Sequence, residues 1–167
     1  PEPASGTLDL AEQIDRFLAY LESERGYSAH TVRGYRVDLE QFRGFVEDKG
    51  TPSGSGPDYR VLREYLGSLH GRYKRTTIAR KLSAVRSFFS FLEKRGVRSD
   101  NPAADVAGLK QGKPIPTYLP VDDMFRLLEG PDRESPLGLR DLAMMEMLYS
   151  CGLRVSELAG LDLGDVD

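Results

Sequence analysis

Positively charged side chains are concentrated in the middle of this sequence, in a pattern suited to contact with nucleic acid. Residues 59–117 contain 13 Lys and Arg against 4 Asp and Glu, a net charge of +9, whereas residues 1–58 and 118–167 are acidic, at −5 and −7. The overall charge of −3 conceals this block. A concentration of positive charge attracts phosphate groups. The charge pattern therefore indicates a nucleic-acid partner for the middle segment.

One candidate surface belongs to a helix predicted from the apolar spacing between Ile78 and Leu92. At about 100° per residue, the face opposite its apolar stripe carries Thr76, Arg80, Ser83, Ala84 and Ser87. A helix that enters the major groove needs such a slim, polar face with an arginine that can reach base edges. Arg72, Lys74 and Arg75 precede it, where the helix dipole favours phosphate. A solvated helix with incidental basic residues is the alternative interpretation.

A second predicted helix, whose apolar stripe runs from Val32 to Val46, repeats this pattern. The face opposite its apolar stripe carries His30, Arg33, Gly34, Val37, Gln41 and Gly44. Each glycine inside a helix costs about 0.5–1 kcal/mol relative to alanine. Close approach of another body would account for these glycines, and that body is either DNA or a crossing helix.

The apolar spacing predicts an all-helical protein, because no segment alternates as a strand would. Four helices are expected before residue 108, ending near Gly26, Gly50 and Gly96 where glycine terminates them, with Ser28 as an N-cap and Thr76 or Thr77 at the entry to the fourth. Their apolar stripes are Leu10, Ile14, Phe17 and Leu21; Val32, Tyr35, Leu39, Phe42 and Val46; Val61, Tyr65, Leu66 and Leu69; and Ile78, Leu82, Val85, Phe89 and Leu92.

Two segments rich in Gly and Pro interrupt this pattern. Residues 50–57 are expected to form a loop, and residues 108–120, with three prolines, an extended linker between two domains. We therefore predict an N-terminal domain over residues 1–107 and a second, helical domain over residues 121–167. Its helices are expected around 121–129, around 137–150 and from 155 to 161.

Composition excludes several classes of protein. The single cysteine, Cys151, cannot form an internal disulfide, and it lies far along the chain from His30 and His70, so no metal site is predicted. No apolar run reaches the roughly 18–20 residues that span a bilayer, and no signal-peptide core is visible. We expect a soluble, cytoplasmic protein with no membrane partner.

Several segments resemble the tyrosine recombinases of the phage integrase family, closest to the XerC branch of the bacterial Xer recombinases. In the N-terminal part the similarity lies in YSAHTVRGYRVDL at 27–39, RKLSAVRSFF at 80–89 and Asn101-Pro102. It continues in VDDM at 121–124 and LGLRDLAM at 137–144, and it is most specific in GLRVSEL at 152–158. The resemblance implies a SAM-like core-binding bundle of four to five helices, followed by the linker and the first helices of a catalytic domain that is incomplete here.

The family's chemistry, as the resemblance implies it, is attack of a tyrosine on a DNA phosphodiester, giving a 3'-phosphotyrosyl intermediate without metal or other cofactor. Arg154 matches the first active-site arginine, whose planar guanidinium can meet two phosphate oxygens as lysine cannot. Glu157 matches the supporting acid, at a spacing from which it can orient the arginine. Without the motif, the two residues would be interpreted as a structural ion pair at the start of a helix.

The resemblance also sets expectations for DNA contacts and for what is missing. None of the eight tyrosines stands in the context of the nucleophile, so the chain is expected to bind DNA and to cut none. The expected partners are a double-stranded recombination core site and, for the full-length protein, a sister recombinase in a synaptic tetramer. The expected DNA-binding residues are His30, Thr31, Arg33, Arg36, Lys74, Arg75, Thr76, Thr77, Arg80, Lys81, Ser83 and Ser87.

The resemblance alone implies the expected biological role, which is chromosome dimer resolution in a bacterial or archaeal cell, in association with the nucleoid. A phage or mobile-element integrase is the alternative within the same fold. A non-catalytic DNA-binding module and a helical protein-interaction domain are alternatives from other classes. The last of these predicts that binding to DNA does not depend on salt.

Overall fold

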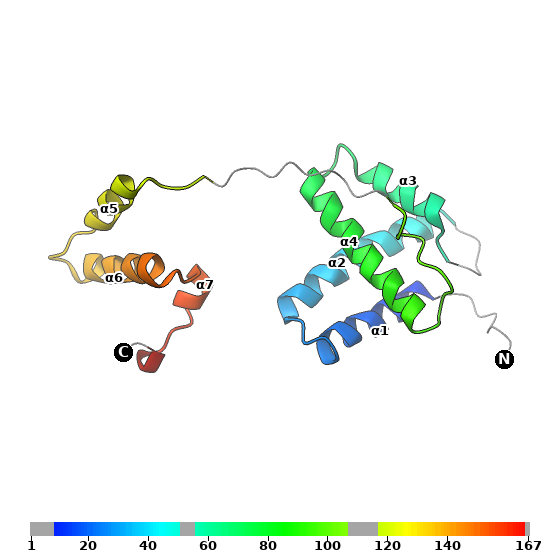
Figure 1. The fold of residues 1–167 in the computed structure, drawn as a ribbon, viewed down its shortest axis with the longest axis horizontal. Helices are drawn as coiled ribbons and strands as arrows, with labels where there is room; N and C mark the ends of the chain where they lie inside the picture. Colours follow the sequence, from blue (N-terminus) through cyan, green and yellow to red (C-terminus); the bar gives the residue numbers. More distant parts are fainter. Residues whose placement is uncertain (1–8, 51–55, 107–116, 166–167) are drawn as a thin grey trace. The chain divides into compact units, whose positions relative to one another are not determined.

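A computed structural model describes residues 9–50, 56–106 and 117–165, and within these ranges the secondary structure is entirely helical (Figure 1). The helices are α1 (Leu10–Ser23), α2 (Ala29–Asp48), α3 (Tyr59–Leu69), α4 (Arg75–Lys94), α5 (Val121–Glu129), α6 (Pro136–Cys151) and α7 (Val155–Leu158), followed by a short 3-10 helix (Leu163–Asp165). The all-helical prediction is confirmed for the described residues.

The chain divides into two compact units, residues 1–112 and 113–167. Most of the predicted linker, residues 108–116, lies outside the described residues, as does most of the predicted loop at 50–57. Residues 117–120 have no regular structure, and Pro120 is the N-cap of α5. The predicted domain boundaries at residues 107 and 121 stay predictions.

Side-chain caps set where the N-terminal helices begin. Asp9 accepts hydrogen bonds from the backbone N–H groups of Ala11 and Glu12, at 2.9 and 3.2 Å. Ser28 caps α2 by accepting from Thr31 N–H at 3.3 Å, as the sequence predicts. Such caps satisfy N–H groups that have no partner within the helix. The fourth helix begins at Arg75, with Lys74 as its N-cap, so Thr76 and Thr77 lie in its first turn and not at its entry.

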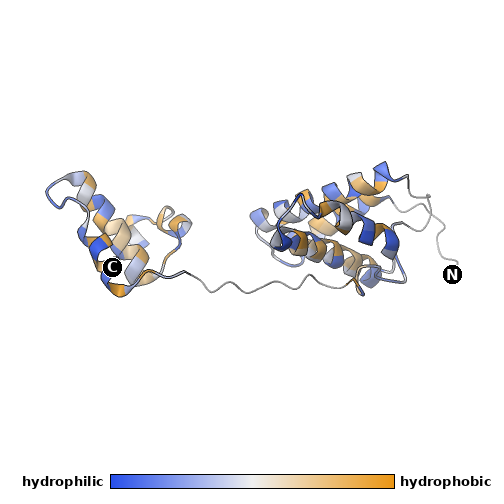
Figure 2. Cartoon of the chain, turned by 90° about the horizontal axis from the view of Figure 1, so that it is seen from above, coloured by the Kyte–Doolittle hydropathy of each residue, from blue (hydrophilic) through white to orange (hydrophobic). Residues whose placement is uncertain are grey.

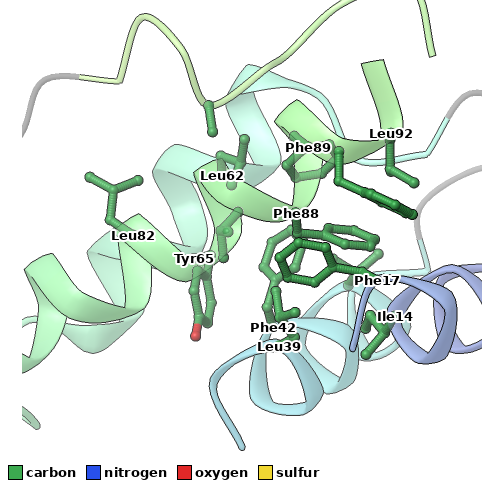
Figure 3. Packing of buried hydrophobic residues seen from close by; sticks show 14 of the residues in the cluster. Ile14, Phe17, Leu39, Phe42, Leu62, Tyr65, Leu82, Phe88, Phe89 and Leu92 are labelled. Atoms are coloured by element: carbon green, nitrogen blue, oxygen red, sulfur yellow. The ribbon is translucent and has the colours of Figure 1, made fainter. Parts of the chain in front are cut away.

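The core of the first unit is a cluster of aliphatic side chains and aromatic rings from α1, α2, α3 and α4 (Figure 3). Phe17 contacts Phe88 with ring centroids 5.7 Å apart, and Phe42 contacts Tyr65 at 5.1 Å. These residues are at most 1% exposed. The predicted apolar stripes supply most of this core, because helices bury the face on which such residues recur.

The segment after α4 is fastened to the bundle by Arg86. Its Nε donates to the carbonyl of Ala103 at 3.0 Å, and its Nη2 donates to the carbonyl of Val106. Ala103 and Val106 are buried against the core. Arg86 therefore closes the N-terminal bundle and is not part of an exposed basic surface.

The second unit packs α6 against α5 and α7 but buries little apolar surface. Leu128 is the only large hydrophobic residue buried among its described residues. Orange, hydrophobic segments are visible along its helices in Figure 2, and its exposed apolar side chains include Phe125, Leu137, Leu139, Met144, Tyr149 and Val155. No helix of the described residues combines the length and the apolar character needed to cross a membrane.

Gly138 allows the turn before α6 to pack against the helix. A Cβ at this position would lie 1.9 Å from the carbonyl oxygen of Asp132, far inside van der Waals contact. The N–H of Gly138 donates to the Oγ of Ser135, the N-cap of α6, at 3.0 Å. The residue type is therefore required by close approach of backbone.

We predict that Gly138→Ala displaces this turn from α6 and lowers the free energy of unfolding of the second unit by about 1–3 kcal/mol, as overpacking does. Backbone amide NMR shifts at residues 131–138 should move strongly. Gly164→Ala is the matched control, because a Cβ there meets nothing within 4 Å. Unchanged shifts around Ser135 in Gly138→Ala would contradict the prediction.

Candidate functional site

A buried carboxylate joins the two helices that carry the predicted DNA-binding residues. Asp38 of α2 is 1% exposed, and its Oδ1 accepts from Nζ of Lys81 on α4 at 2.9 Å. Its Oδ2 accepts from Nη1 of Arg80, also on α4. A buried charge requires a partner of opposite sign. This contact therefore fixes α2 and α4 beside each other at the level of Asp38.

The two cations differ sharply in exposure. The Lys81 side chain is 4% exposed, whereas the Arg80 side chain is 56% exposed. The expectation that Lys81 contacts DNA is therefore corrected: its ammonium is buried against Asp38. Ala84, which the helical projection places on the outer face, is also buried, at 4% exposed. Both lie close enough to the apolar stripe for the bundle to cover them.

The turn between α3 and α4 is held by Tyr73. Its hydroxyl accepts a hydrogen bond from Nε2 of Gln41 on α2 at 3.0 Å. Its ring lies 5.3 Å from Nζ of Lys81, a cation–π distance. The turn also carries Arg72 and Lys74, both exposed. Tyr73 therefore positions these basic residues relative to α2 and α4.

A buried tyrosine hydroxyl lies near the same network. Tyr65 is 1% exposed, and its hydroxyl has no hydrogen-bond partner among the described residues. Burial raises the pKa of this phenol well above its usual value, and the negative charge of Asp38 raises it further. Tyr65 therefore stays protonated at any physiological pH.

The other predicted DNA-binding residues lie at or near the surface of α2, α4 and the turn before α4. Arg36 is exposed and pairs with Asp15 of α1 at 2.9 Å. Thr77 and Ser87 are partly buried. The remaining exposed members of the set are His30, Thr31, Arg33, Lys74, Arg75, Thr76, Arg80 and Ser83.

The two glycines inside α2 do not serve a helix crossing among the described residues. A Cβ added at Gly34 or at Gly44 would meet nothing within 4 Å. Val37, which lies between them in the sequence, is 60% exposed. Of the two explanations that the sequence left open, close approach of a helix finds no support here. The surface that these residues form with Arg33 and Gln41 is slim and open.

Two residues of this region were missed as site residues from sequence. Asp38 and Tyr73 organise the surface without belonging to the predicted faces or the predicted basic set, whereas Gln41, which binds Tyr73, lies on the predicted outer face of α2. One feature of the sequence pointed to Asp38. This residue is next to Leu39, on the side of α2 that faces the core, and a carboxylate buried there requires a positively charged partner. No spacing rule identifies which lysine or arginine supplies that cation.

Arg154 and Glu157 form a compact pair at the start of α7. The N–H of Arg154 donates to Glu157 Oε2 and its Nη1 donates to Oε1, both at 2.7 Å. The backbone hydrogen bond from Arg154, followed by that from its side chain, lowers the pKa of the Glu157 carboxyl. The Arg154 side chain is 80% exposed. Glu157 therefore orients an arginine whose outer edge is open to a ligand.

The described residues contain no group of three or more His, Cys, Asp or Glu side chains placed to hold a metal ion. Cys151 is exposed at the end of α6.

Family comparisons match both units of the chain. The family described as "Phage integrase, N-terminal SAM-like domain" matches residues 14–96, and the one described as "Phage integrase family" matches residues 117–167. The chain belongs to the phage integrase family of tyrosine recombinases. The resemblance noted in the sequence is confirmed, and so is the SAM-like helical fold of the N-terminal unit.

Curated relatives in this family carry the name tyrosine recombinase XerC. The protein of Myxococcus xanthus is 39% identical over 158 residues, which cover 95% of this chain and 53% of the relative. That of Thermodesulfovibrio yellowstonii is 43% identical over 156 residues, covering 92% and 50%. The chain therefore spans about half the length of these recombinases.

Solved structures of integrases share the fold at low sequence identity. A lambda integrase dimer bound to a COC' core site aligns with a TM-score of 0.69 and 20% identity, covering 98% of this chain and 45% of that one. The integrase from mycobacterium phage Brujita aligns with a TM-score of 0.57 and 21% identity, covering 87% and 47%. These likenesses establish the integrase fold of the chain.

We predict that Asp38→Ala lowers the free energy of unfolding of this chain by about 3–5 kcal/mol, because Lys81 is left as a buried charge without its partner. Urea denaturation followed by circular dichroism measures the change. Glu64→Ala is the control, since it removes an exposed ion pair with Lys49, and such pairs contribute little. Equal effects of the two substitutions would contradict the buried pair.

The Glu157 carboxyl should titrate below the usual range for glutamate, as followed by carbon NMR at Cδ. Because its folded pKa is lowered, it stabilises the first turn of α7 above the usual glutamate pKa, and this is lost as pH falls through the lowered value. Arg154→Ala should move the midpoint only part of the way back, since the backbone N–H remains. An ordinary midpoint in the parent chain would disprove the pair.

Proposed function

We propose that this chain is the DNA-binding part, with the beginning of the catalytic domain, of a site-specific tyrosine recombinase. It binds double-stranded DNA at a recombination core site through the outer faces of α2 and α4. The observation that carries this proposal is the open surface of α2, where Gly34, Val37 and Gly44 leave room beside exposed cations. A helix face of this kind fits a major groove.

In the complete recombinase, Arg154 binds the phosphate at which a strand is cleaved. Its guanidinium donates parallel hydrogen bonds to two phosphate oxygens, on which charge develops as the phosphate is attacked. Glu157 holds the arginine through the two hydrogen bonds described above. The nucleophile is a tyrosine supplied from outside these 167 residues, it forms a 3'-phosphotyrosyl intermediate, and no cofactor takes part. The chain by itself therefore binds DNA without cutting it.

The biological role that we propose is resolution of chromosome dimers, in the cytoplasm and at the nucleoid of a bacterium or archaeon. The name XerC shared by the curated relatives supports this role over that of a phage integrase. The partners are the core site and a sister recombinase in a synaptic tetramer. We assign residues 1–107 to core binding, 108–120 to the linker and 121–167 to the start of the catalytic domain.

A binding titration with a labelled Xer-type core duplex and a scrambled duplex at several salt concentrations tests this function. The affinity should favour the core site and fall by about 0.9 in log affinity per tenfold salt for each phosphate neutralised. No covalent adduct should form on a nicked suicide duplex. Absence of binding at low salt, or binding that is indifferent to salt, would instead favour a protein-interaction domain.

Substitution of the α2 glycines separates DNA contact from stability. Gly34→Gln and Gly44→Gln should each raise the free energy of unfolding by up to about 1 kcal/mol through helix propensity, yet weaken DNA binding by filling the open surface. Gly67→Gln on α3 is the matched control, because a Cβ there also meets nothing within 4 Å. It should add stability without weakening DNA binding, and equal affinities for all three variants would remove α2 from the interface.

A further inference from the structure

Two cations from adjacent positions of α4 share a single carboxylate, and the sharing is unequal. Lys81 is buried with Asp38, whereas Arg80 reaches Asp38 from the surface and keeps 56% of its side chain exposed. The charge of Asp38 is already balanced by Lys81. Arg80 is therefore anchored by a carboxylate without having its own charge cancelled, and one net positive charge remains at the surface.

The anchor uses only part of the arginine's hydrogen-bonding capacity. Nη1 donates to Asp38 Oδ2, while Nε and Nη2 have no hydrogen-bond partner among the described residues. A guanidinium is planar, so holding one nitrogen also limits the orientations of the others. Adjacent donors of this kind can form the bidentate contact that arginine makes with O6 and N7 of guanine.

Tyr73 contacts the buried cation of this arrangement. Its ring lies over Lys81 Nζ at 5.3 Å, and Gln41 holds its hydroxyl at 3.0 Å. The pair of Asp38 and Lys81 is itself buried, with side chains that are 1% and 4% exposed. An ion pair in such surroundings holds its geometry more firmly than one at the surface, where water screens it.

We propose that Asp38 is a positioning residue for sequence recognition: supported by Lys81, it holds Arg80 in the orientation with which it reads a base. The inference rests on the proposed function, because it requires DNA on the outer face of α4. A preoriented side chain loses less conformational freedom on binding, and only the sequence that matches its orientation gains from this. Asp38 therefore contributes to discrimination between sites more than to general affinity for DNA.

The double variant Asp38→Leu/Lys81→Met separates this role from folding. It replaces a buried ion pair by apolar residues, a change that is often neutral for stability, and it leaves the net charge unchanged. The ratio of affinities for core and scrambled duplexes should fall about tenfold, the order expected for a lost bidentate base contact. Affinity for the scrambled duplex and the salt dependence should not change, since the phosphate contacts remain.

Three further measurements complete the test. Arg80→Ala should lower the ratio as much as the double variant does, and should lower it no further when added to that variant. The heteronuclear NOE of the Arg80 Nε–H should fall in Asp38→Leu/Lys81→Met even without DNA. Glu64→Leu/Lys49→Met removes an exposed pair between α3 and the end of α2, and should leave both readouts unchanged.

If Asp38→Leu/Lys81→Met does not fold, Asp38→Asn/Lys81→Met takes its place. Its expected loss of preference is smaller, because the amide oxygen of the new side chain can still accept a hydrogen bond from Arg80.

The outcomes distinguish this inference from the proposed function. A parent chain that prefers the core site, together with a double variant that keeps the full preference, overturns the positioning role and leaves the function standing. Retained preference in Arg80→Ala overturns it as well, because Arg80 then reads no base. A parent chain that binds neither duplex overturns both.

Discussion

The carboxylate of Asp38 is the contact on which the arrangement of α2 against α4 depends. Aromatic packing holds the bundle together, but apolar contacts are non-directional and tolerate small shifts of one helix along another. A buried ion pair tolerates them far less, because a displaced partner leaves a charge without compensation. The pairing of Asp38 with Lys81 therefore fixes the register in which the outer faces of the two helices present their polar side chains.

The two units of the chain differ in how much of their apolar surface they bury. The N-terminal unit encloses an aromatic core, and Arg86 fastens its last segment. The second unit leaves side chains such as Phe125 and Leu139 more than half exposed. The chain spans about half of its XerC relatives. An exposed apolar surface of this extent is typical of a surface that meets another part of a protein, which agrees with our assignment of residues 121–167 to the start of a larger domain.

The pair formed by Arg154 and Glu157 shows how a structural contact and a proposed catalytic role coincide. Glu157 caps α7 through the Arg154 backbone and also binds its guanidinium. The same carboxylate that caps the helix through a backbone hydrogen bond thus also limits the orientations of the arginine side chain. Geometry alone is compatible with a purely structural pair, and it is membership of the phage integrase family that supports the role of Arg154 in binding phosphate.

The helices, most of the apolar core and the family can be predicted from the residues alone. Residues such as Phe17, Phe42 and Val85 recur at helical spacing, and GLRVSEL at 152–158 is specific. Periodicity and motifs are local features, so they can be recognised without knowing which helices pack against one another. Other features depend on contacts that periodicity does not specify. The pairing of Asp38 with the buried Lys81 and the open space beside Gly34 depend on how segments far apart in the sequence pack, and the close approach at Gly138 depends on a turn that folds back onto its own helix. These features become visible only once the chain is folded, because charge and size do not reveal which of two adjacent cations faces inward.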